Sequence, residues 1–200
     1  TGQRILQLLP INDTTMTGTW EDSYPYNANS TFALHPQFLR LTEAGVEEND
    51  EYRRLRDELN ALPEVDYERV NRTKNDLLRK AFKRGWQRSG EAVATFVEAN
   101  ERWLPDYALF MALKRHFGMK PWQEWPDEAV RLHEPAALAR YRELLREDVE
   151  LFTYIQFLFF RQWTALKSYI NSLGIGIIGD LPIYVAMDSA DVWAERSMFR

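Results

Sequence analysis

The sequence lacks cysteine altogether, so its 200 residues form no disulfide bond and offer no thiolate nucleophile. Histidine is scarce: only three occur, and their scattered positions lack the paired spacing of metal ligands, so we expect no metal site. A glycine-rich phosphate loop is also missing, because the glycines of GIGIIGD (174–180) alternate with isoleucine inside a strand pattern. These absences leave no sign of metal or phosphate-loop chemistry.

Long hydrophobic runs are absent as well. The longest apolar stretch, residues 151–160, is interrupted by Gln156 and is too short to cross a bilayer. We expect no signal peptide at the N-terminus, and the lack of cysteine fits a reducing compartment. The sequence therefore predicts a soluble, cytoplasmic protein with no membrane partner.

An excess of basic residues is the next absence. Lysine and arginine total 25 against 30 acidic residues, for a net charge of −5. The basic residues are interspersed with acids along helical patterns such as EYRRLRDELN (51–60), which is typical of solvated helix faces. Nucleic-acid binding needs a clustered basic face, so we expect no nucleic-acid partner.

Aromatic residues, by contrast, are abundant, at 14% of the chain with seven tryptophans. Such side chains bring large buried areas to a core, and their faces also stack on sugars and bases. The tryptophans beyond the first 34 residues lie mostly at helical spacing, where packing is the simplest explanation. Trp20 differs, because it lies in a polar loop.

Two short apolar runs lie near opposite ends of the chain. RILQLLP (4–10) and IGIIGDLPIYV (175–185) have the pattern of strands buried on both faces of a parallel sheet. Residues 35–173 between them have a helical pattern. Two strands cannot form a self-sufficient sheet, so the sequence predicts an excerpt of an α/β protein. Its three parts are 1–34, 35–173 and 174–200.

Proline and glycine mark where the helices should begin, end or bend. Proline fits a first helical turn, and glycine adopts the left-handed conformation that ends a helix. We expect one helix to begin at Pro105 and end at Gly118, and the last long helix to end at Gly174. We expect breaks at Gly85 with residues 89–91, and a bend near Asp148 in the long stretch 135–173.

Asp180 stands directly beyond the second apolar run. Ligands of parallel α/β folds meet the carboxyl ends of the strands, so an acid at that place favours ligand binding. The alternative is that its carboxylate caps the following turn. In DSADVW (188–193), the structural interpretation is the stronger one: Asp188 is predicted as a helix N-cap and Asp191 as the reciprocal acid of a capping box.

The loop after the first run, residues 14–32, is long enough to be functional. Its aromatic side chains could stack on sugar rings and its polar side chains could bond sugar hydroxyls. Alternatively, the loop buries its aromatics for stability. The candidates are Trp20, Tyr24 and Tyr26 for stacking, and Asp22, Ser23 and Asn27 for hydroxyls.

Five segments of the chain carry a resemblance to a known family. They are LQLLPINDT (6–14), DSYPYNANSTFALHP (22–36), WLPDYALFMALK (103–114), IQFLFFRQW (155–163) and GIIGDLPIYVAMDSADVW (176–193). Together they resemble the 4-α-glucanotransferases of glycoside hydrolase family 77, the amylomaltases or disproportionating enzymes. The last segment is the most specific. DSYPY differs from the family's usual DSPY by the inserted Tyr24.

The resemblance implies an incomplete (β/α)8 TIM barrel fragment, mostly helical. The two runs would be the second and third barrel strands, parallel to each other, and 35–173 a large helical insertion with a barrel helix. The implied activity is retaining transfer of α-1,4-glucan segments between maltooligosaccharides, which needs two carboxyl groups about 5–5.5 Å apart. The resemblance places this catalytic pair outside the chain and implies no cofactor.

The resemblance carries three substrate-binding residues over to this sequence: Asp180 in GDLPIYVA, and Tyr26 and Ser23 in DSYPYN. Asp180 would contact the sugar or orient catalytic groups, and Tyr26 would pack against the sugar. The partners would be α-1,4-glucans and maltooligosaccharides. A second hypothesis is a helical protein-interaction module without a catalytic role. Under either hypothesis, surface that missing strands would cover stays exposed, so we expect self-association.

Overall fold

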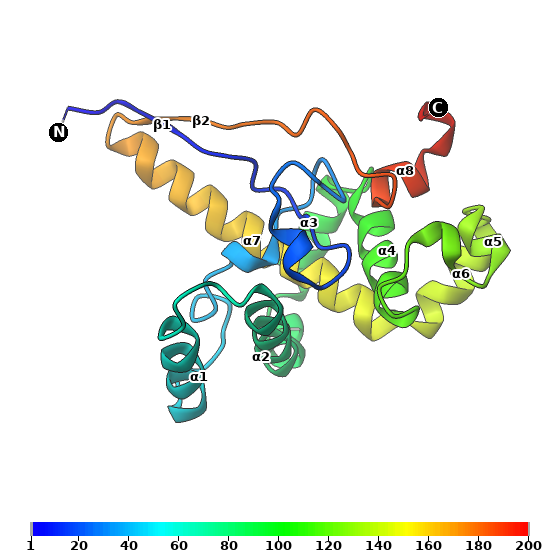
Figure 1. Ribbon diagram of the computed structural model, residues 1–200, viewed down its shortest axis with the longest axis horizontal. Coiled ribbons are helices and arrows are strands. Elements are labelled where there is room, and N and C mark those ends of the chain that lie inside the picture. Colours follow the sequence, from blue (N-terminus) through cyan, green and yellow to red (C-terminus); the bar gives the residue numbers. More distant parts are fainter. Residues whose placement is uncertain (1, 200) are drawn as a thin grey trace.

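Two short strands from opposite ends of the chain lie side by side. In the computed structural model, which describes residues 2–199, β1 (Ile5–Gln7) pairs with β2 (Gly176–Ile178) in parallel, with Leu6 opposite Ile177 (Figure 1). The Leu8 amide extends the ladder by donating to the Ile178 carbonyl at 3.0 Å. The parallel pairing predicted from the sequence is confirmed.

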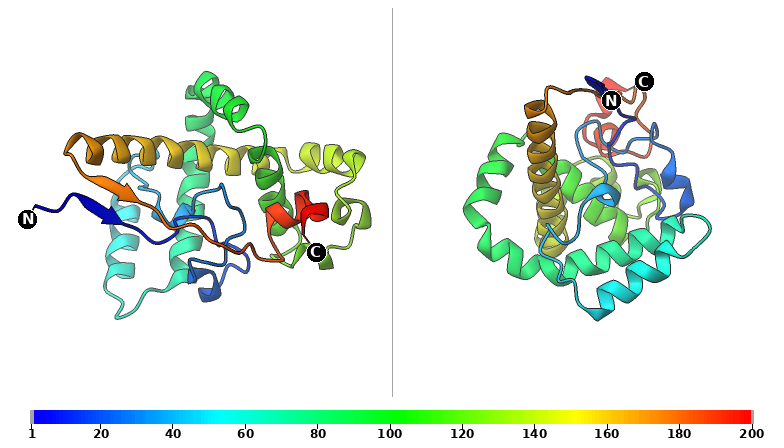
Figure 2. Two further views of the ribbon diagram at one scale, coloured as in Figure 1. Left: turned by 90° about the horizontal axis from the view of Figure 1, so that it is seen from above. Right: turned by 90° about the vertical axis from the view of Figure 1, so that its left-hand side faces the viewer.

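The prediction that both strands are buried on both faces is wrong for the part of the chain that the structure describes. Ile5 is 61% exposed, Leu6 44% and Ile178 51%. The pair lies beside the C-terminal end of α7 (Arg146–Ser172), as Figure 2 shows. Within residues 2–199 the sheet has two strands, so these apolar side chains lack the neighbours that would cover them.

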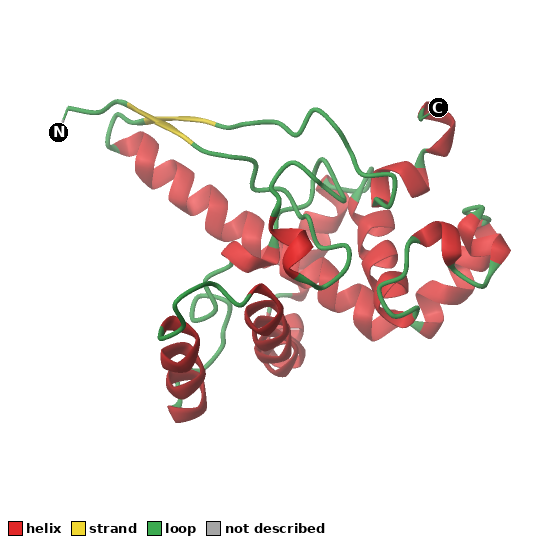
Figure 3. Cartoon of the chain, viewed as in Figure 1, coloured by secondary structure: helices red, strands yellow, loops and turns green. Residues whose placement is uncertain are grey.

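Helices make up most of the described chain (Figure 3). Besides α7, the α-helices are α1 (Asp50–Asn60), α2 (Tyr67–Arg88), α3 (Gly90–Ala99), α4 (Leu104–His116), α5 (Glu128–Arg131), α6 (Pro135–Leu144) and α8 (Ala190–Ala194). Four short 3-10 helices complete the order: η1 (Trp20–Ser23), η2 (Pro36–Phe38), η3 (Trp122–Glu124) and η4 (Arg196–Met198). Within residues 2–199, no helix combines the length and apolarity that a membrane crossing requires.

Two buried clusters form the core, and α7 borders both. One surrounds α4 and includes Phe110, Trp125 and Trp193, all with 0% exposure. The other joins α2 to α7 through Phe82 and Ile155. Each such side chain stabilises the fold by about 1.5–3 kcal/mol through removal of apolar surface from water. The packing role predicted for the tryptophans beyond residue 34 is confirmed at Trp125.

Three predicted helix boundaries are confirmed. Pro105 lies in the first turn of α4. Gly118 follows the end of α4 with φ +68°, and Gly174 follows the end of α7 with φ +74°. A residue with a Cβ is strained at such φ values, so glycine ends both helices at low cost.

Two predicted interruptions are confirmed and one is wrong. Helix α2 ends at Arg88 and α3 begins at Gly90, at the break predicted for residues 89–91. The long stretch 135–173 is interrupted at Leu145, near Asp148 as predicted. The break predicted at Gly85 is wrong, because α2 continues through it. Gly85 makes room for the Tyr154 hydroxyl instead; a Cβ there would lie 2.1 Å from that oxygen. Asp148 lies in the first turn of α7, where its carboxylate pairs with Arg79.

The capping roles predicted for Asp188 and Asp191 are also wrong. Ser189 is the N-cap of α8, and its hydroxyl accepts the Val192 amide at 3.2 Å. Asp191 accepts instead from the Thr31 amide at 2.8 Å. Both acids have partners far away in the sequence, and tertiary contacts outweigh the local capping pattern.

Asp188 pairs with Lys114, a lysine on α4 with 0% exposure. The ammonium lies 2.5 Å from Asp188 Oδ2 and also donates to the carbonyls of Met119 and Lys120. Asp188 Oδ1 accepts the Trp122 amide at 3.0 Å. A charge this deeply buried is tolerated because all these groups satisfy one another. The contact anchors the segment after β2 to α4.

Candidate functional site

The parallel strands bring the two main predicted site residues into contact. Asp180 lies two residues beyond β2, and Tyr26 lies in the loop that follows β1. The carboxyl ends of parallel strands meet at the same edge of a sheet. There the Tyr26 hydroxyl donates to Asp180 Oδ2 at 2.9 Å, across 154 positions of sequence.

In the Tyr26–Asp180 contact, the Tyr26 phenol is the protonated partner. The hydrogen bond to Asp180 is the main cause that raises the pKa of the Tyr26 phenol above its ordinary value, and desolvation adds to it. The phenol therefore stays a donor at neutral pH. Within residues 2–199, the Oδ1 atom of Asp180 accepts no hydrogen bond, so one carboxylate oxygen is available to a ligand hydroxyl.

Ser23, the third predicted residue, lies apart from this pair. It is exposed at the end of η1 and lines a small cavity of about 110 Å³. Neither Tyr26 nor Asp180 lines that cavity. The structure thus brings Tyr26 and Asp180 together and leaves Ser23 on a neighbouring part of the same loop.

The loop's other candidates divide between surface and support. Trp20 is 67% exposed and Tyr24 61%, so burial for stability does not explain either ring. Tyr24 lies 5.6 Å from the Tyr26 ring, centroid to centroid. Asp22, in contrast, is buried, and its carboxylate accepts hydrogen bonds from Thr17 and Gly18. Asp22 therefore shapes the loop instead of facing a ligand.

A buried polar network that sequence reasoning missed fastens this loop to the helices. The Tyr107 hydroxyl on α4 donates to Asp13 Oδ2 at 2.5 Å, and Gln156 on α7 donates to the Tyr107 oxygen at 3.3 Å. Gln156 also brackets Leu34: its Oε1 accepts the Leu34 amide and its Nε2 donates to the Leu34 carbonyl. Burial raises the pKa of Tyr107 well above its usual value, so it remains a neutral donor. The signal in the sequence is Gln156 itself, a polar residue interrupting an apolar run.

His35 lies beside this network and is buried. Its Nδ1 accepts the Gln37 amide at 3.2 Å and lies 3.8 Å from Asp13 Oδ1, while Nε2 has no partner within the described residues. Burial lowers the pKa of His35, with Asp13 opposing the shift. His35 is accordingly a neutral part of the loop's support. Across residues 2–199, no group of three or more acidic, histidine or cysteine side chains is arranged to hold a metal ion.

The geometry defines the class of the protein. Two parallel strands are separated in sequence by a long helical excursion, and polar side chains meet beyond their carboxyl ends. This is the arrangement of an α/β protein with its ligand site at the strand ends.

Comparisons with known proteins agree with this class and give the family. A family model described as 4-alpha-glucanotransferase, glycoside hydrolase family 77, matches residues 1–200. The chain belongs to this family. A 4-alpha-glucanotransferase of Thermus thermophilus is 42% identical over 206 residues, covering 99% of this chain and 39% of the relative; one of Clostridium butyricum is 36% identical over 201 residues, covering 99% and 40%.

A solved structure is similar as well. An amylomaltase from Streptococcus agalactiae in complex with acarbose superposes with a TM-score of 0.87 at 36% identity, covering 98% of this chain and 39% of that one. The chain therefore shares its fold with the corresponding part of that amylomaltase. It spans about 40% of the length of the curated relatives it matches.

Proposed function

We propose that the protein containing this chain transfers α-1,4-glucan segments between maltooligosaccharides with retention of configuration. Residues 1–200 would supply one wall of the glucan site. The observation that carries the proposal is the Tyr26–Asp180 hydrogen bond at the carboxyl ends of two paired parallel strands. Family membership supports it. No observation favours the alternative of a helical interaction module, because the family match extends through the helical part as well.

In this proposal, Asp180 binds the sugar and is not the nucleophile. Its free Oδ1 accepts a glucose hydroxyl, while Tyr26 holds Oδ2 and offers its ring to the sugar face. Ser23 contributes a further hydroxyl contact from the neighbouring part of the loop. The nucleophile and the acid/base, which a retaining mechanism places about 5–5.5 Å apart, would come from residues outside this chain.

The proposed architecture follows from the strand pairing. β1 and β2 would be the second and third strands of a (β/α)8 barrel, and residues 35–173 a helical insertion with one barrel helix. Residues 1–34 would provide a barrel strand with the substrate loop, and 174–200 the next strand with its loop. The exposed side chains of Ile5 and Ile178 support this arrangement, because neighbouring strands would cover them. We place the protein in the cytoplasm.

Replacement of Asp180 tests the sugar-binding role. In the intact protein, Asp180→Asn should lower kcat/KM for maltotriose disproportionation by roughly 10- to 150-fold, the value of a charge-assisted hydrogen bond. Tyr26→Phe keeps the ring and loses the hydroxyl, so a loss of about 2- to 10-fold is expected. Asp76→Asn is the matched control: Asp76 is an exposed acid on α2, and the variant should behave as wild type.

Glucose release from maltotriose is the assay. An Asp180→Asn variant with the turnover of Asp76→Asn would remove Asp180 from the site. Proton NMR of the transfer product should show an α configuration at the newly formed glycosidic bond, and a β linkage would rule out retention. Residues 1–200 alone should release no glucose, because the catalytic carboxyl pair is proposed to lie elsewhere.

A further inference from the structure

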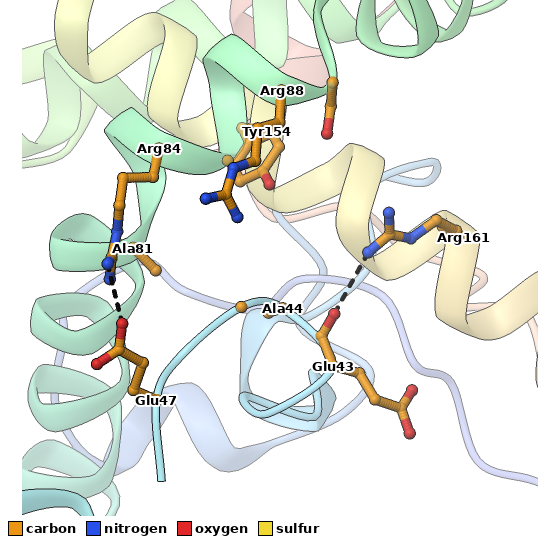
Figure 4. Close-up of a pocket in the computed structure, with 11 residues that line it drawn as sticks. Glu43, Ala44, Glu47, Ala81, Arg84, Arg88, Tyr154 and Arg161 are labelled. Carbon is orange, nitrogen blue, oxygen red and sulfur yellow. Dashed lines mark hydrogen bonds and ion pairs between the residues drawn. The ribbon is translucent and has the colours of Figure 1, made fainter. Parts of the chain in front are cut away.

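A second pocket lies within the helical part of the chain, away from Tyr26 and Asp180. It has a volume of about 410 Å³, within the usual range for small-molecule sites, and neither of those two residues lines it. Its walls come from α2, α7 and the turn before α1. Figure 4 shows the lining side chains, which include three arginines: Arg84 and Arg88 on α2, and Arg161 on α7.

The charges of this pocket do not cancel. Its two acids already have cations: Glu47 pairs with Arg84 at 2.9 Å, and the Glu43 carboxylate pairs with Arg40 at 3.1 Å. Arg161 donates to the Glu43 backbone carbonyl at 3.3 Å. Among the described residues, neither Arg161 nor Arg88 has a carboxylate within ion-pair distance. Arg161 does have an aromatic neighbour, since its guanidinium lies over the Phe157 ring at 5.5 Å from the centroid.

Arg88 is directed into the space between the other two arginines. In Figure 4 its guanidinium points toward the interior of the pocket, and no dashed line joins it to a partner. Exposed arginines on a helix are usually just solvated, so this cluster alone identifies no ligand.

Tyr154 provides the independent observation. The residue is only 5% exposed, yet within residues 2–199 its hydroxyl makes no hydrogen bond. The hydroxyl oxygen itself remains accessible to solvent, on the side that faces the pocket. A buried tyrosine normally finds a partner for its O–H group. Here the hydroxyl reaches the pocket past Gly85, where a Cβ would lie 2.1 Å from the oxygen. The glycine thus leaves room for a donor that opens onto the pocket.

We propose that this pocket binds a phosphate group, either as the free ion or as a monoester. Two guanidinium groups without a carboxylate partner and one hydroxyl line the pocket from α2 and α7, and all three are donors. A phosphate dianion offers several strong acceptor oxygens to such a set, and arginine matches its geometry bidentately. The volume of the pocket exceeds what the free ion fills, so the organic part of a monoester also fits.

Calorimetric titration of the intact protein tests this site. The probes are inorganic phosphate and glycerol 3-phosphate, with glycerol as the uncharged match; none of them is a sugar that would enter the proposed glucan site. Saturable binding of a charged probe, without binding of glycerol, is expected. Tighter binding of glycerol 3-phosphate than of inorganic phosphate would identify a monoester site, and the reverse order a site for the free ion.

Two variants and one control locate the binding. Arg88→Gln and Tyr154→Phe should each raise Kd for the tighter probe, the first by roughly tenfold or more. Arg72→Gln removes an equal charge from the same helix outside the pocket and should leave Kd within about twofold of wild type. Absence of saturable binding of both charged probes at millimolar concentration would overturn the proposal. Equal losses in Arg72→Gln and Arg88→Gln would overturn it too, since they would reduce the effect to overall charge.

Discussion

Replacing Gln156 with leucine should destabilise the protein far more than the same replacement at Gln162. Both glutamines lie on α7, and each brackets the backbone of one loop residue. Gln156 bonds the Leu34 amide and carbonyl at 2.9 and 2.8 Å, and Gln162 bonds those of Arg40 at 2.9 and 2.9 Å. The main difference is burial: Gln156 is 0% exposed, whereas the Gln162 bonds lie at an exposed site.

The expected magnitude follows from what replaces the lost bonds. Leucine has nearly the volume of glutamine, so little cavity forms. In Gln156→Leu, two backbone groups lose their partner where water is excluded, at about 1–3 kcal/mol each. Greater apolar burial offsets part of this cost, which leaves a net loss of about 2–4 kcal/mol in the free energy of unfolding. In Gln162→Leu, water takes over both bonds, and the change should stay within about 0.5 kcal/mol.

Urea unfolding of the intact protein, followed by circular dichroism, is the assay. The free energy of unfolding taken from these curves should fall by about 2–4 kcal/mol for Gln156→Leu. For Gln162→Leu it should fall by less than about 0.5 kcal/mol. Equal shifts in the two variants would refute the reasoning, because they would show that burial does not set the cost of these bonds.

Three further predictions concern other buried groups. Lys114→Met should lower the free energy of unfolding in urea by about 3–5 kcal/mol, because it leaves Asp188 without its cation. The control Lys167→Met, at an exposed lysine of α7, should lower it by less than about 0.5 kcal/mol. Equal losses would contradict a structural role for the Lys114–Asp188 pair. Gly85→Ala should lower the urea midpoint despite alanine's higher helix propensity, because its Cβ would overlap the Tyr154 hydroxyl. Adding Tyr154→Phe to this variant should restore part of the loss. An unchanged midpoint in Gly85→Ala would mean that the tyrosine moves at no cost. The pKa of His35 is lowered in the folded state, so the unfolded chain takes up a proton first as the pH falls. Stability that is present above about pH 6.5 is therefore lost at lower pH. His35→Gln should show a smaller drop in urea midpoint between about pH 7 and pH 5 than wild type, and an identical drop would remove His35 as the source.

The sequence predicted much of the framework correctly. The apolar runs are where the strands form, and Pro105, Gly118 and Gly174 mark helix boundaries as expected. The position of Asp180 beyond a strand and the family motif around Tyr26 both indicate site residues, and the structure brings the two into contact.

The wrong predictions at Asp188 and Gly85 share one cause. The capping pattern at Asp188 was locally plausible, but a buried lysine 74 positions away binds that carboxylate more favourably than the α8 amides do. At Gly85, a tyrosine from another helix needs the space that a side chain would fill, so the glycine serves packing and does not break α2. Neither contact partner can be predicted from the residues adjacent in sequence.

Local structure is therefore the part of this fold that can be read from short stretches of sequence. Helix ends follow from the φ preferences of proline and glycine, and strand positions follow from short apolar runs, because both depend on interactions within a few residues. Which distant groups meet depends on how the elements pack: Tyr26 meets Asp180, Lys114 meets Asp188, and Gln156 meets Leu34. A buried polar group must find its partner wherever the packing of the helices and strands places one, and that placement depends on the whole described chain.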